Sequence, residues 1–367
     1  MRQMNSLIPC ANPYRQYLEQ KQEIDQAVYK VMNSDNYILG PEVENFEREF
    51  TQYIGTKYCI GVNSGTDALI LALRALGIGS GDEVIAPSHT AVATISAIVM
   101  SGATPVFVDV DYNSYTINPD LVLKSITNKT KAIIAVHLYG HPCDMDSLQE
   151  IAAKKGVSIV EDCSQAHGAL WKGKKVGSIG AIGCFSFYPT KNLGAIGDGG
   201  AITTNDKLIA DKILQLRQYG WNSDKKSQIQ SSVSRLDEIQ AAILRIKLTK
   251  LDMFNSKRQK IARHYFEHLA DSELSMPTSK MDVNHVFHLF VARTNRRDEL
   301  IFALNRLNIY PGIHYPAPVH LHPAFKSIPH NGLPVTESLA ESIVSIPMFP
   351  ELTEAELSRV CKGVLSV

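Results

Sequence analysis

Between residues 57 and 220, short apolar runs alternate with longer segments whose apolar residues recur at helical spacing. The short runs are rich in β-branched residues, which is typical of buried strands. The predicted strands are YCIGV, DEVIAP, TPVFVDV, KAIIAVHL and VSIVED, and the predicted helices between them are TDALILALRAL, AVATISAIVM and SLQEIAAKK. This alternation predicts an α/β fold with a mainly parallel sheet covered by helices on both faces. Because ligands of such sheets bind beyond the carboxyl ends of the strands, the residues after each strand are the first site candidates.

The segments on either side of this alternation carry helical patterns. Before it, YRQYLEQKQEIDQAVYKVM and PEVENFEREFTQYI predict two helices. After it, residues 235–269 contain neither Gly nor Pro and space their apolar residues helically, which predicts one long connecting helix. HVFHLFVART, RDELIFALNRLN and TEAELSRVCKGVL then predict a further set of strand and helices. We therefore predict a large domain over residues 1–250 and a smaller C-terminal α/β domain over residues 251–367.

The balance of charged residues indicates which kinds of molecule this protein binds. The 367-residue chain has 37 basic and 37 acidic residues and no run of like charges, so neither nucleic acid nor an acidic membrane is a predicted partner. No signal-peptide core precedes the first helix, and no apolar run is long enough to cross a bilayer. These features predict a cytoplasmic protein that acts on a small molecule.

The cysteines and histidines do not predict a metal site. The six cysteines are scattered without a Cys-x-x-Cys pair, so reduced thiols are expected. His137, His141, Cys143 and Asp144 lie together in HLYGHPCD, but this segment lacks the paired ligand spacing of zinc sites. A junction between a strand and a turn explains the same residues, and we predict no metal.

Three stretches at strand ends carry candidate chemistry. In YCIGVNSGTDALILAL, a strand runs through Gly65 and Thr66 directly into a helix, whose free N–H groups suit a phosphate; a Ser or Thr at this place is also an ordinary helix cap. In VSIVEDCSQAHGA a strand ends at Asp162, which suits a protonated ring nitrogen, and the nearby Gln165 suits a ring substituent; taken alone, such an Asp is more commonly a helix or turn cap. CFSFYPTKNLGAIGDGGA places Ser186 five residues before Lys191.

Taken together, these stretches predict a pyridoxal 5′-phosphate site. The cofactor needs an amine that can form a Schiff base, an acid beside its pyridine nitrogen, and a helix end with hydroxyls for its phosphate. Lys191, Asp162 and the pair of Ser186 with the helix start would supply these groups. His89, in APSHTAVAT, follows a strand and is placed either to stack on the ring or to serve as an ordinary loop histidine.

Competing site motifs fail on detail. GIGSGDE, residues 77–83, has three glycines but precedes a strand, whereas the dinucleotide-binding fingerprint follows one. The chain also contains neither Gly-x-Ser-x-Gly nor His-Glu-x-x-His, which removes the commonest hydrolase motifs.

The same stretches resemble the DegT/StrS family of sugar-nucleotide aminotransferases. The resemblance rests on ILGPEVENFEREF, VNSGTDALILALRALGIGSGDEVIAPSHTAVAT, GATPVFVDVD, VEDCSQAHGA, GCFSFYPTKNLGAIGDGGA, SRLDEIQAAIL, IHYPAPVHLHPAF and SIPMFPELTEAEL, and so covers nearly the whole chain. It implies a fold-type I aminotransferase with a mixed, mainly parallel sheet, a homodimer with shared active sites, and pyridoxamine 5′-phosphate as the intermediate cofactor form. It also implies transfer of an amino group, usually from L-glutamate, to a nucleotide-linked keto sugar.

Carried over to this chain, the family pattern makes Lys191 the Schiff-base lysine and Asp162 the partner of the ring nitrogen. By the same resemblance Gln165 would touch the ring hydroxyl and His89 would stack on the ring, and the phosphate would be held by Gly65, Thr66 and Ser186. One departure stands out: related chains usually have Asn where this chain has Val233, and that asparagine commonly reaches the phosphate in the neighbouring subunit. Val233 cannot donate a side-chain hydrogen bond, which puts this cross-subunit contact in doubt.

The substrate is the least determined part of the resemblance. VHLYGHP, FYPTKNLGA and RQYGW are most similar to the branch that aminates carbon 3 of dTDP-linked 3-oxo-6-deoxyhexoses, which supplies deoxyamino sugars for lipopolysaccharide, O-antigen or other glycans. Tyr315 and His320, in HYPAPVH, are substrate-loop candidates. The alternatives are an aminotransferase acting on carbon 4, a pyridoxal-phosphate-dependent sugar dehydratase, and a regulatory protein that binds the cofactor or a sugar nucleotide without turnover. Since some dehydratases of this kind replace the lysine by histidine, Lys191 favours transamination.

Overall fold

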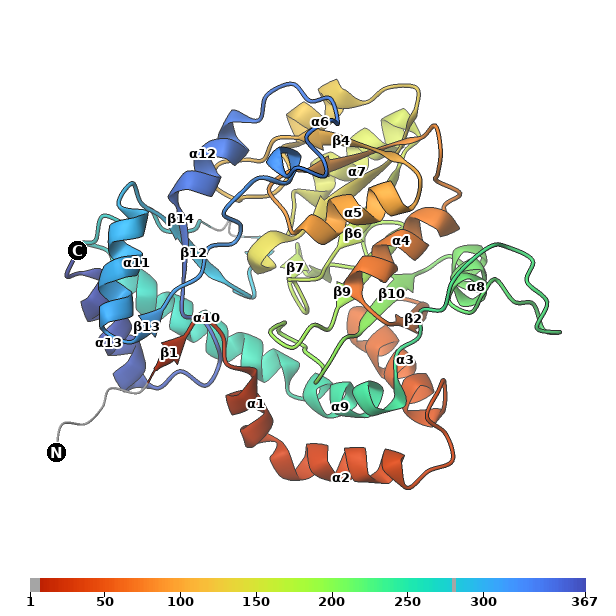
Figure 1. The fold of residues 1–367 in the computed structure, drawn as a ribbon, viewed down its shortest axis with the longest axis horizontal. Helices are drawn as coiled ribbons and strands as arrows, with labels where there is room; N and C mark the ends of the chain where they lie inside the picture. The colour runs from red at the N-terminus through yellow and green to blue at the C-terminus, as the bar shows by residue number, and fades with distance from the viewer. Residues whose placement is uncertain (1–6, 279–281) are drawn as a thin grey trace.

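A central seven-stranded sheet organises the computed structural model, which describes residues 7–278 and 282–367 (Figure 1). Its strand order is β2-β10-β9-β6-β5-β3-β4, and all strands run in one direction except β10, which is antiparallel to both neighbours. The strands are β2 (Tyr58–Val62), β3 (Glu83–Pro87), β4 (Thr104–Val108), β5 (Thr130–Val136), β6 (Ser158–Asp162), β9 (Ile182–Ser186) and β10 (Gly200–Thr204). The predicted mixed, mainly parallel sheet is confirmed.

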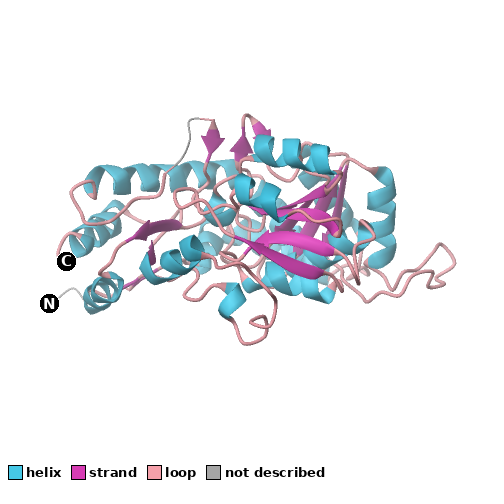
Figure 2. Cartoon of the chain, turned by 90° about the horizontal axis from the view of Figure 1, so that it is seen from above, coloured by secondary structure: helices cyan, strands magenta, loops and turns pink. Residues whose placement is uncertain are grey.

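Helices cover both faces of this sheet, as the view from above shows (Figure 2). Alternate residues of one strand enter different cores: Ile134 belongs to the core that includes α4 (Gly65–Ala75), α5 (Val92–Met100) and α8 (Lys207–Leu216), while its neighbour Ile133 belongs to the core that includes α6 (Pro119–Ser125) and α7 (Met145–Lys155). On the second face, α3 (Pro41–Ile54) and α9 (Glu238–Leu248) cover the edge formed by β2, β10 and β9. A strand buried on both faces is largely apolar, and this composition predicts β2, β3, β4, β5 and β6 but not β9 or β10.

The C-terminal part forms a smaller unit around the antiparallel pair β12 (Phe290–Arg293) and β14 (Ile343–Ile346). Its core is completed by α10 (Leu251–His268), α11 (Arg297–Arg306) and α13 (Glu354–Val364). The chain start also joins it, because β1 (Ile8–Pro9) pairs with β13 (Ile309–Tyr310). The predicted boundary near residue 250 falls between α9 and α10, and the division into two domains stays a prediction.

The single long helix predicted over residues 235–269 is wrong, because the chain forms α9 and α10 with a break at Thr249 and Lys250. The Thr249 hydroxyl donates to the carbonyl of Ile246 at 2.8 Å, and Lys250 N–H bonds the carbonyl of Lys247 at 3.1 Å, which tightens the last turn of α9. The break lets α9 pack on α3 and α10 pack on α13. The first predicted helix is likewise divided, into α1 (Pro13–Glu19) and α2 (Lys21–Met32).

A buried carboxylate joins two distant sequence motifs. Glu238, at the start of α9, accepts hydrogen bonds at 2.9 Å from the backbone N–H groups of Gly40, Glu42 and Val43 at the start of α3. These N–H groups have no partner within α3, and a carboxylate is favoured at the positive end of a helix. Among the described helices, none is both long and apolar enough to cross a membrane.

Candidate active site

The carboxyl ends of β2, β6 and β9 meet at one edge of the sheet and open into a cavity of about 530 Å³. Seven of the predicted site residues line it: Gly65, Thr66, Asp162, Gln165, Ser186, Lys191 and Tyr315. They are spread over 250 positions of sequence, and the parallel arrangement of the strands brings them together. The last of them, Tyr315, comes from the C-terminal unit, so the cavity lies between the sheet and that unit.

The start of α4 forms one wall of the cavity. The Ser64 hydroxyl caps this helix by accepting a hydrogen bond from Asp67 N–H at 3.1 Å. Gly65 lies so close to the end of β9 that a Cβ atom built on it would be 2.5 Å from the Cβ of Ser186. Gly65, Thr66 and Ser186 therefore form one part of the cavity wall, and the positive end of α4 suits a phosphate there.

Asp162 ends β6 with its carboxylate held from two sides. One oxygen accepts a hydrogen bond from the Thr94 hydroxyl at 2.9 Å, and the other accepts one from Ser164 N–H at 3.1 Å. The carboxylate is thus oriented in the cavity wall, where it can face a positively charged ring nitrogen.

Gln165 connects the sheet edge to the C-terminal segment. Its side-chain oxygen accepts a hydrogen bond from Tyr139 N–H at 2.7 Å, and its nitrogen donates to the Tyr315 hydroxyl at 2.9 Å. Burial raises the pKa of Tyr315 to about 12, so this hydroxyl stays protonated and can act as a donor at neutral pH. Gln165 therefore positions Tyr315 as well as lining the cavity.

Lys191 lies in the loop that leaves β9, and its amine reaches the cavity. Burial lowers the pKa of Lys191 from its ordinary 10.5 to about 8, while the charge of Asp162 opposes part of this shift. A lysine with a lowered pKa has a larger fraction of neutral, nucleophilic amine near neutral pH. The arrangement can therefore hold a carbonyl compound by condensation with Lys191. The start of α4 can bind a phosphate of that compound, and Asp162 can bind its basic nitrogen.

Two predicted residues do not reach this cavity. His89 is buried and hydrogen-bonded through Nε2 to the Tyr139 hydroxyl at 2.8 Å, and its neighbours Thr90 and Ala91 line the cavity in its place. His320 is buried between the end of β3 and α12 (Pro334–Ser342). Its Nδ1 bonds the Ser88 hydroxyl at 2.7 Å and its Nε2 lies 3.2 Å from Glu337. The structure thus gives both histidines contacts that hold loops in place.

The sequence profile of the DegT/DnrJ/EryC1/StrS aminotransferase family matches residues 18–365. The chain belongs to this family. It is 46% identical over 360 residues to the dTDP-3-amino-3,4,6-trideoxy-alpha-D-glucose transaminase of Streptomyces venezuelae, covering 97% of this chain and 95% of the relative. It is 47% identical over 358 residues to the dTDP-3-amino-3,6-dideoxy-alpha-D-galactopyranose transaminase of Aneurinibacillus thermoaerophilus, with 98% and 99% coverage. Among solved structures, S. venezuelae DesV in complex with a ketimine intermediate superposes with a TM-score of 0.96 at 46% identity, covering 98% of each chain.

The site of this aminotransferase also contains residues that the sequence did not single out. Tyr188 and Thr190 flank the lysine in the loop after β9, and their position beside Lys191 was the available signal. His288 and His314 come from the C-terminal unit, and Thr94 acts behind Asp162. His314 adjoins the predicted Tyr315, whereas no pattern of apolar residues marks His288 as part of the site. Val233 is 36% exposed and lies outside the lining of this cavity.

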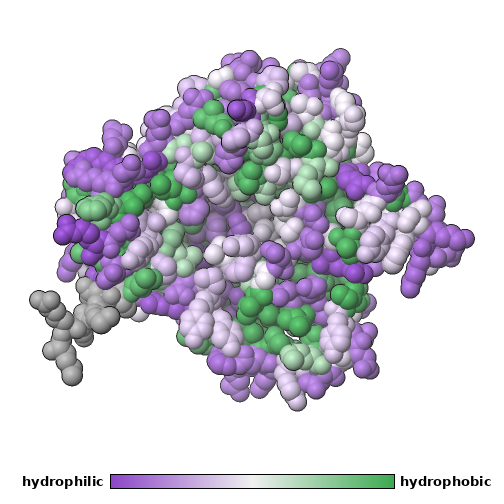
Figure 3. Space-filling view, in the orientation of Figure 1, coloured by the Kyte–Doolittle hydropathy of each residue, from purple (hydrophilic) through white to green (hydrophobic). Residues whose placement is uncertain are grey.

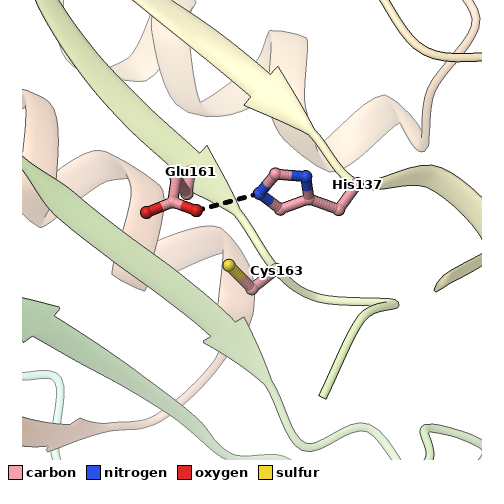
Figure 4. A group of neighbouring side chains, drawn as sticks. All are labelled: His137, Glu161 and Cys163. Atoms are coloured by element: carbon pink, nitrogen blue, oxygen red, sulfur yellow. Dashed lines mark hydrogen bonds and ion pairs between the residues drawn. The ribbon is translucent and has the colours of Figure 1, made fainter. Parts of the chain in front are cut away.

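A buried cluster behind the site accounts for part of HLYGHPCD. Glu161 accepts hydrogen bonds from three backbone N–H groups, those of Gly177, Ile179 and Gly180, at 2.6–2.8 Å, and lies 3.1 Å from Nε2 of His137 (Figure 4). Nδ1 of His137 accepts a hydrogen bond from Cys143 N–H at 3.0 Å. Cys163 lies beside this pair, and the three side chains have the composition of a metal site. Because hydrogen bonds already occupy the ligand atoms of His137 and Glu161, we interpret the cluster as a support for the end of β6.

Proposed function

We propose that this aminotransferase uses pyridoxal 5′-phosphate to transfer an amino group from L-glutamate to carbon 3 of a dTDP-linked 3-oxo-6-deoxyhexose. The observation that carries the proposal is the meeting of Lys191, Asp162 and the start of α4 in one cavity. The substrate is supported by two relatives, 46% and 47% identical over nearly the whole chain, whose names both specify dTDP-linked 3-amino sugars. A carbon 4 aminotransferase and a dehydratase remain the alternatives, and we favour neither, since both relatives are named for a 3-amino product.

The residues present fit the cofactor. When bound, pyridoxal 5′-phosphate supplies a carbonyl that condenses with amines and a ring that accepts electrons from the substrate carbon. The start of α4 would bind its phosphate together with Thr66 and Ser186, and Asp162 would keep its ring nitrogen protonated. The missing Cβ at Gly65 lets the start of α4 lie directly against Ser186, so that the helix N–H groups and the Ser186 hydroxyl would bind the same phosphate.

Lys191 would act as both the cofactor's amine partner and the proton carrier. After an incoming amine displaces it, its free amine can remove a proton from the donor carbon and later return one to the sugar carbon. A group that gains and loses a proton in each cycle works best when its pKa lies near the working pH, and burial brings the pKa of Lys191 to about 8.

The C-terminal unit would bind the sugar. Tyr315 and His314 line the cavity from the C-terminal unit, and Tyr188 lines it from the loop that carries Lys191. These residues offer hydroxyl and imidazole groups to sugar hydroxyls. His320 would not contact the sugar; it would hold the segment that follows Tyr315 against the end of β3.

We also propose a homodimer. An apolar groove is lined by α1, α2, α9 and the loop after Lys191, with Tyr14, Tyr29, Met32 and Ile196 exposed by 48–69%. Figure 3 shows hydrophobic residues gathered over this part of the molecule. The segment around Asn222–Ser227 also projects from the body (Figure 1). A second copy covering the groove would lie next to Ile196 and could place its projecting segment near the active site.

Absorption spectroscopy tests the function directly. Apoprotein loaded with pyridoxal 5′-phosphate should show the band of lysine-bound cofactor, and L-glutamate should replace it with the band of pyridoxamine 5′-phosphate. Addition of a dTDP-3-oxo-6-deoxyhexose should restore the first band and yield a 3-amino sugar, identified by mass spectrometry and NMR. The Lys191→Ala protein should show neither change. Conversion of a 4-oxo sugar with no conversion of the 3-oxo sugar would contradict the proposed substrate, and binding without turnover would favour the regulatory alternative.

Sedimentation tests the assembly. Tyr29→Asp places a charge in the apolar groove and should shift the protein from dimer to monomer. Leu208→Asp is the matched control, because Leu208 is 79% exposed on α8, away from the groove. Equal dimerisation of both variants would place the interface elsewhere.

A further inference from the structure

Asn192, the residue after Lys191, has both ends of its side-chain amide engaged. Its nitrogen donates to the carbonyl of Val286 at 3.1 Å and to the side-chain oxygen of Asn255 at 2.8 Å. Its oxygen lies 3.2 Å from Nδ1 of His288. A backbone carbonyl can only accept, so the Val286 carbonyl determines which end of the Asn192 amide is the nitrogen.

Asn255 has its amide oriented in the same way. Its nitrogen donates to the carbonyl of His167 at 2.8 Å, which leaves its oxygen facing Asn192. Two backbone carbonyls therefore set the direction of the whole chain of hydrogen bonds. At its end the Asn192 oxygen is an acceptor, so Nδ1 of His288 must carry the hydrogen.

The backbone of His288 is held as firmly as its ring. Arg258 donates to the carbonyls of Phe287 and His288 at 3.3 and 3.2 Å. On the other side, Leu289 N–H bonds the carbonyl of Tyr139 at 3.3 Å, and a Cβ on Gly140 would lie 3.0 Å from the nitrogen of His288. A ring held at both its backbone and its Nδ1 presents its remaining nitrogen in a defined direction.

That remaining nitrogen, Nε2, has no hydrogen-bond partner among the described residues, and His288 lines the cavity together with Lys191. Burial lowers the pKa of His288 well below 6.5, and the nearby charges of Lys191 and Arg258 lower it further. The imidazole is therefore neutral, with an unprotonated Nε2. The Lys191 amine likewise makes no hydrogen bond to a described residue, while both oxygens of Asp162 already accept one from Thr94 or Ser164.

We propose that Asn192 and Asn255 hold His288 in its Nδ1-protonated tautomer, so that the unprotonated Nε2 accepts a hydrogen bond when the Lys191 side chain, which bonds no described residue in this structure, turns toward it with its amine protonated. Asn192 and Asn255 are then positioning residues, and His288 is the acceptor that holds the amine in place and stabilises its protonated form. The role of a free lysine amine rests on the proposed function, whereas the tautomer of His288 follows from the hydrogen bonds alone.

The tautomer can be measured in the apoprotein by NMR with ¹⁵N-labelled histidine. We expect His288 to show a protonated Nδ1 and an unprotonated Nε2 across neutral pH. Asn192→Leu removes the acceptor and should release the ring to a mixture of tautomers. A protonated Nε2 in the wild-type protein would overturn the inference, and this result does not depend on whether any variant folds.

A pair of variants separates the two nitrogens of His288. In His288→Asn the side-chain amide takes the position of Nδ1, so the hydrogen bond to Asn192 is kept while the acceptor at the position of Nε2 is lost. In His288→Gln the longer side chain carries its amide to the position of Nε2, so an acceptor for the Lys191 amine is kept there. The measurement is the pH dependence of pyridoxal 5′-phosphate capture by the apoprotein, followed by absorbance. Loss of a hydrogen bond to a charged group should lower the apparent pKa of capture by about one unit in His288→Asn, and by less in His288→Gln.

The outcomes of this experiment are distinct. An unshifted pKa in a folded His288→Asn protein would overturn the inference, because His288 would then not contact the amine. Failure of the wild-type protein to capture the cofactor at any pH would instead contradict the proposed function, and the tautomer measurement would still decide the role of Asn192.

Discussion

Substitution of Gly65 by alanine tests the contact between α4 and β9 at the proposed phosphate end of the cavity. The new Cβ would lie 2.5 Å from the Cβ and 3.1 Å from the Cα of Ser186. Carbon atoms in contact are normally about 3.5–4.0 Å apart, so the two segments must separate by about 1 Å. Neither clashing atom is the end of a flexible side chain, and rotation of a side chain cannot relieve the overlap.

The cost follows from two effects. Overpacking of this kind costs about 1–3 kcal/mol. Displacement of the first N–H groups of α4 would also weaken hydrogen bonds to a charged phosphate, each worth about 1.5–3 kcal/mol. The first effect lowers the stability of the folded protein, whereas the second lowers cofactor affinity: a loss of about 3 kcal/mol from the weakened hydrogen bonds corresponds to binding about 100-fold weaker.

The assay is titration of apoprotein with pyridoxal 5′-phosphate, followed by fluorescence. Gly79→Ala is the matched control, because a Cβ on Gly79 meets only the carbonyl of Ser101, at 3.5 Å, and Gly79 lies outside the cavity lining. Its affinity should stay at the wild-type value. If Gly65→Ala bound the cofactor within about threefold of the wild-type protein, the start of α4 would not be the phosphate site.

Two further predictions concern buried charge. The pKa of Lys191 is about 8 in the folded protein and 10.5 when unfolded, so the unfolded state binds more protons between these values and stability should rise with pH. Urea unfolding of the apoprotein measures this effect: the free energy of unfolding of the Lys191→Met protein should exceed that of the wild-type protein most below pH 8. This difference should shrink as the pH approaches 10.5, and a difference that stays constant with pH would refute the lowered pKa. Glu161→Gln leaves buried N–H donors of Gly177 or Gly180 facing an amide nitrogen and should lower the free energy of unfolding by about 3 kcal/mol. Glu150→Gln, on the exposed surface, should change it by less than about 0.5 kcal/mol, and equal effects would contradict the role of Glu161.

The sequence by itself determined most of the local elements of the large sheet and most of the predicted residues that line the cavity. Strands buried on both faces must be apolar along their whole length, so five of them could be located from their composition. Parallel strands place their carboxyl ends at one edge, and this rule predicts that Gly65, Asp162 and Lys191 lie close together, as they do in the cavity. The motifs around these residues also identified the family.

Helix continuity could not be predicted from spacing. Residues 235–269 have a helical pattern throughout, but the hydrogen bonds of Thr249 and Lys250 end α9, and its two halves pack on different partners. Helical periodicity indicates which residues of a segment face a hydrophobic core. It does not indicate whether the two halves of the segment face the same core.

The histidines show most clearly what only the tertiary structure decided. His89 follows a strand as the site residues do, yet its ring bonds Tyr139, and His320 bonds Ser88 and Glu337. His288 lies in an apolar run with no chemical motif, yet it lines the same cavity as Lys191, and its Nδ1 is bonded to Asn192, which is bonded in turn to Asn255. A histidine's role depends on which groups bond its two nitrogens, and in these three cases the partners lie 17 to 232 positions away in sequence. Composition and local pattern determine where a strand ends, whereas the direction and protonation of a side chain are set by contacts that exist only in the folded chain.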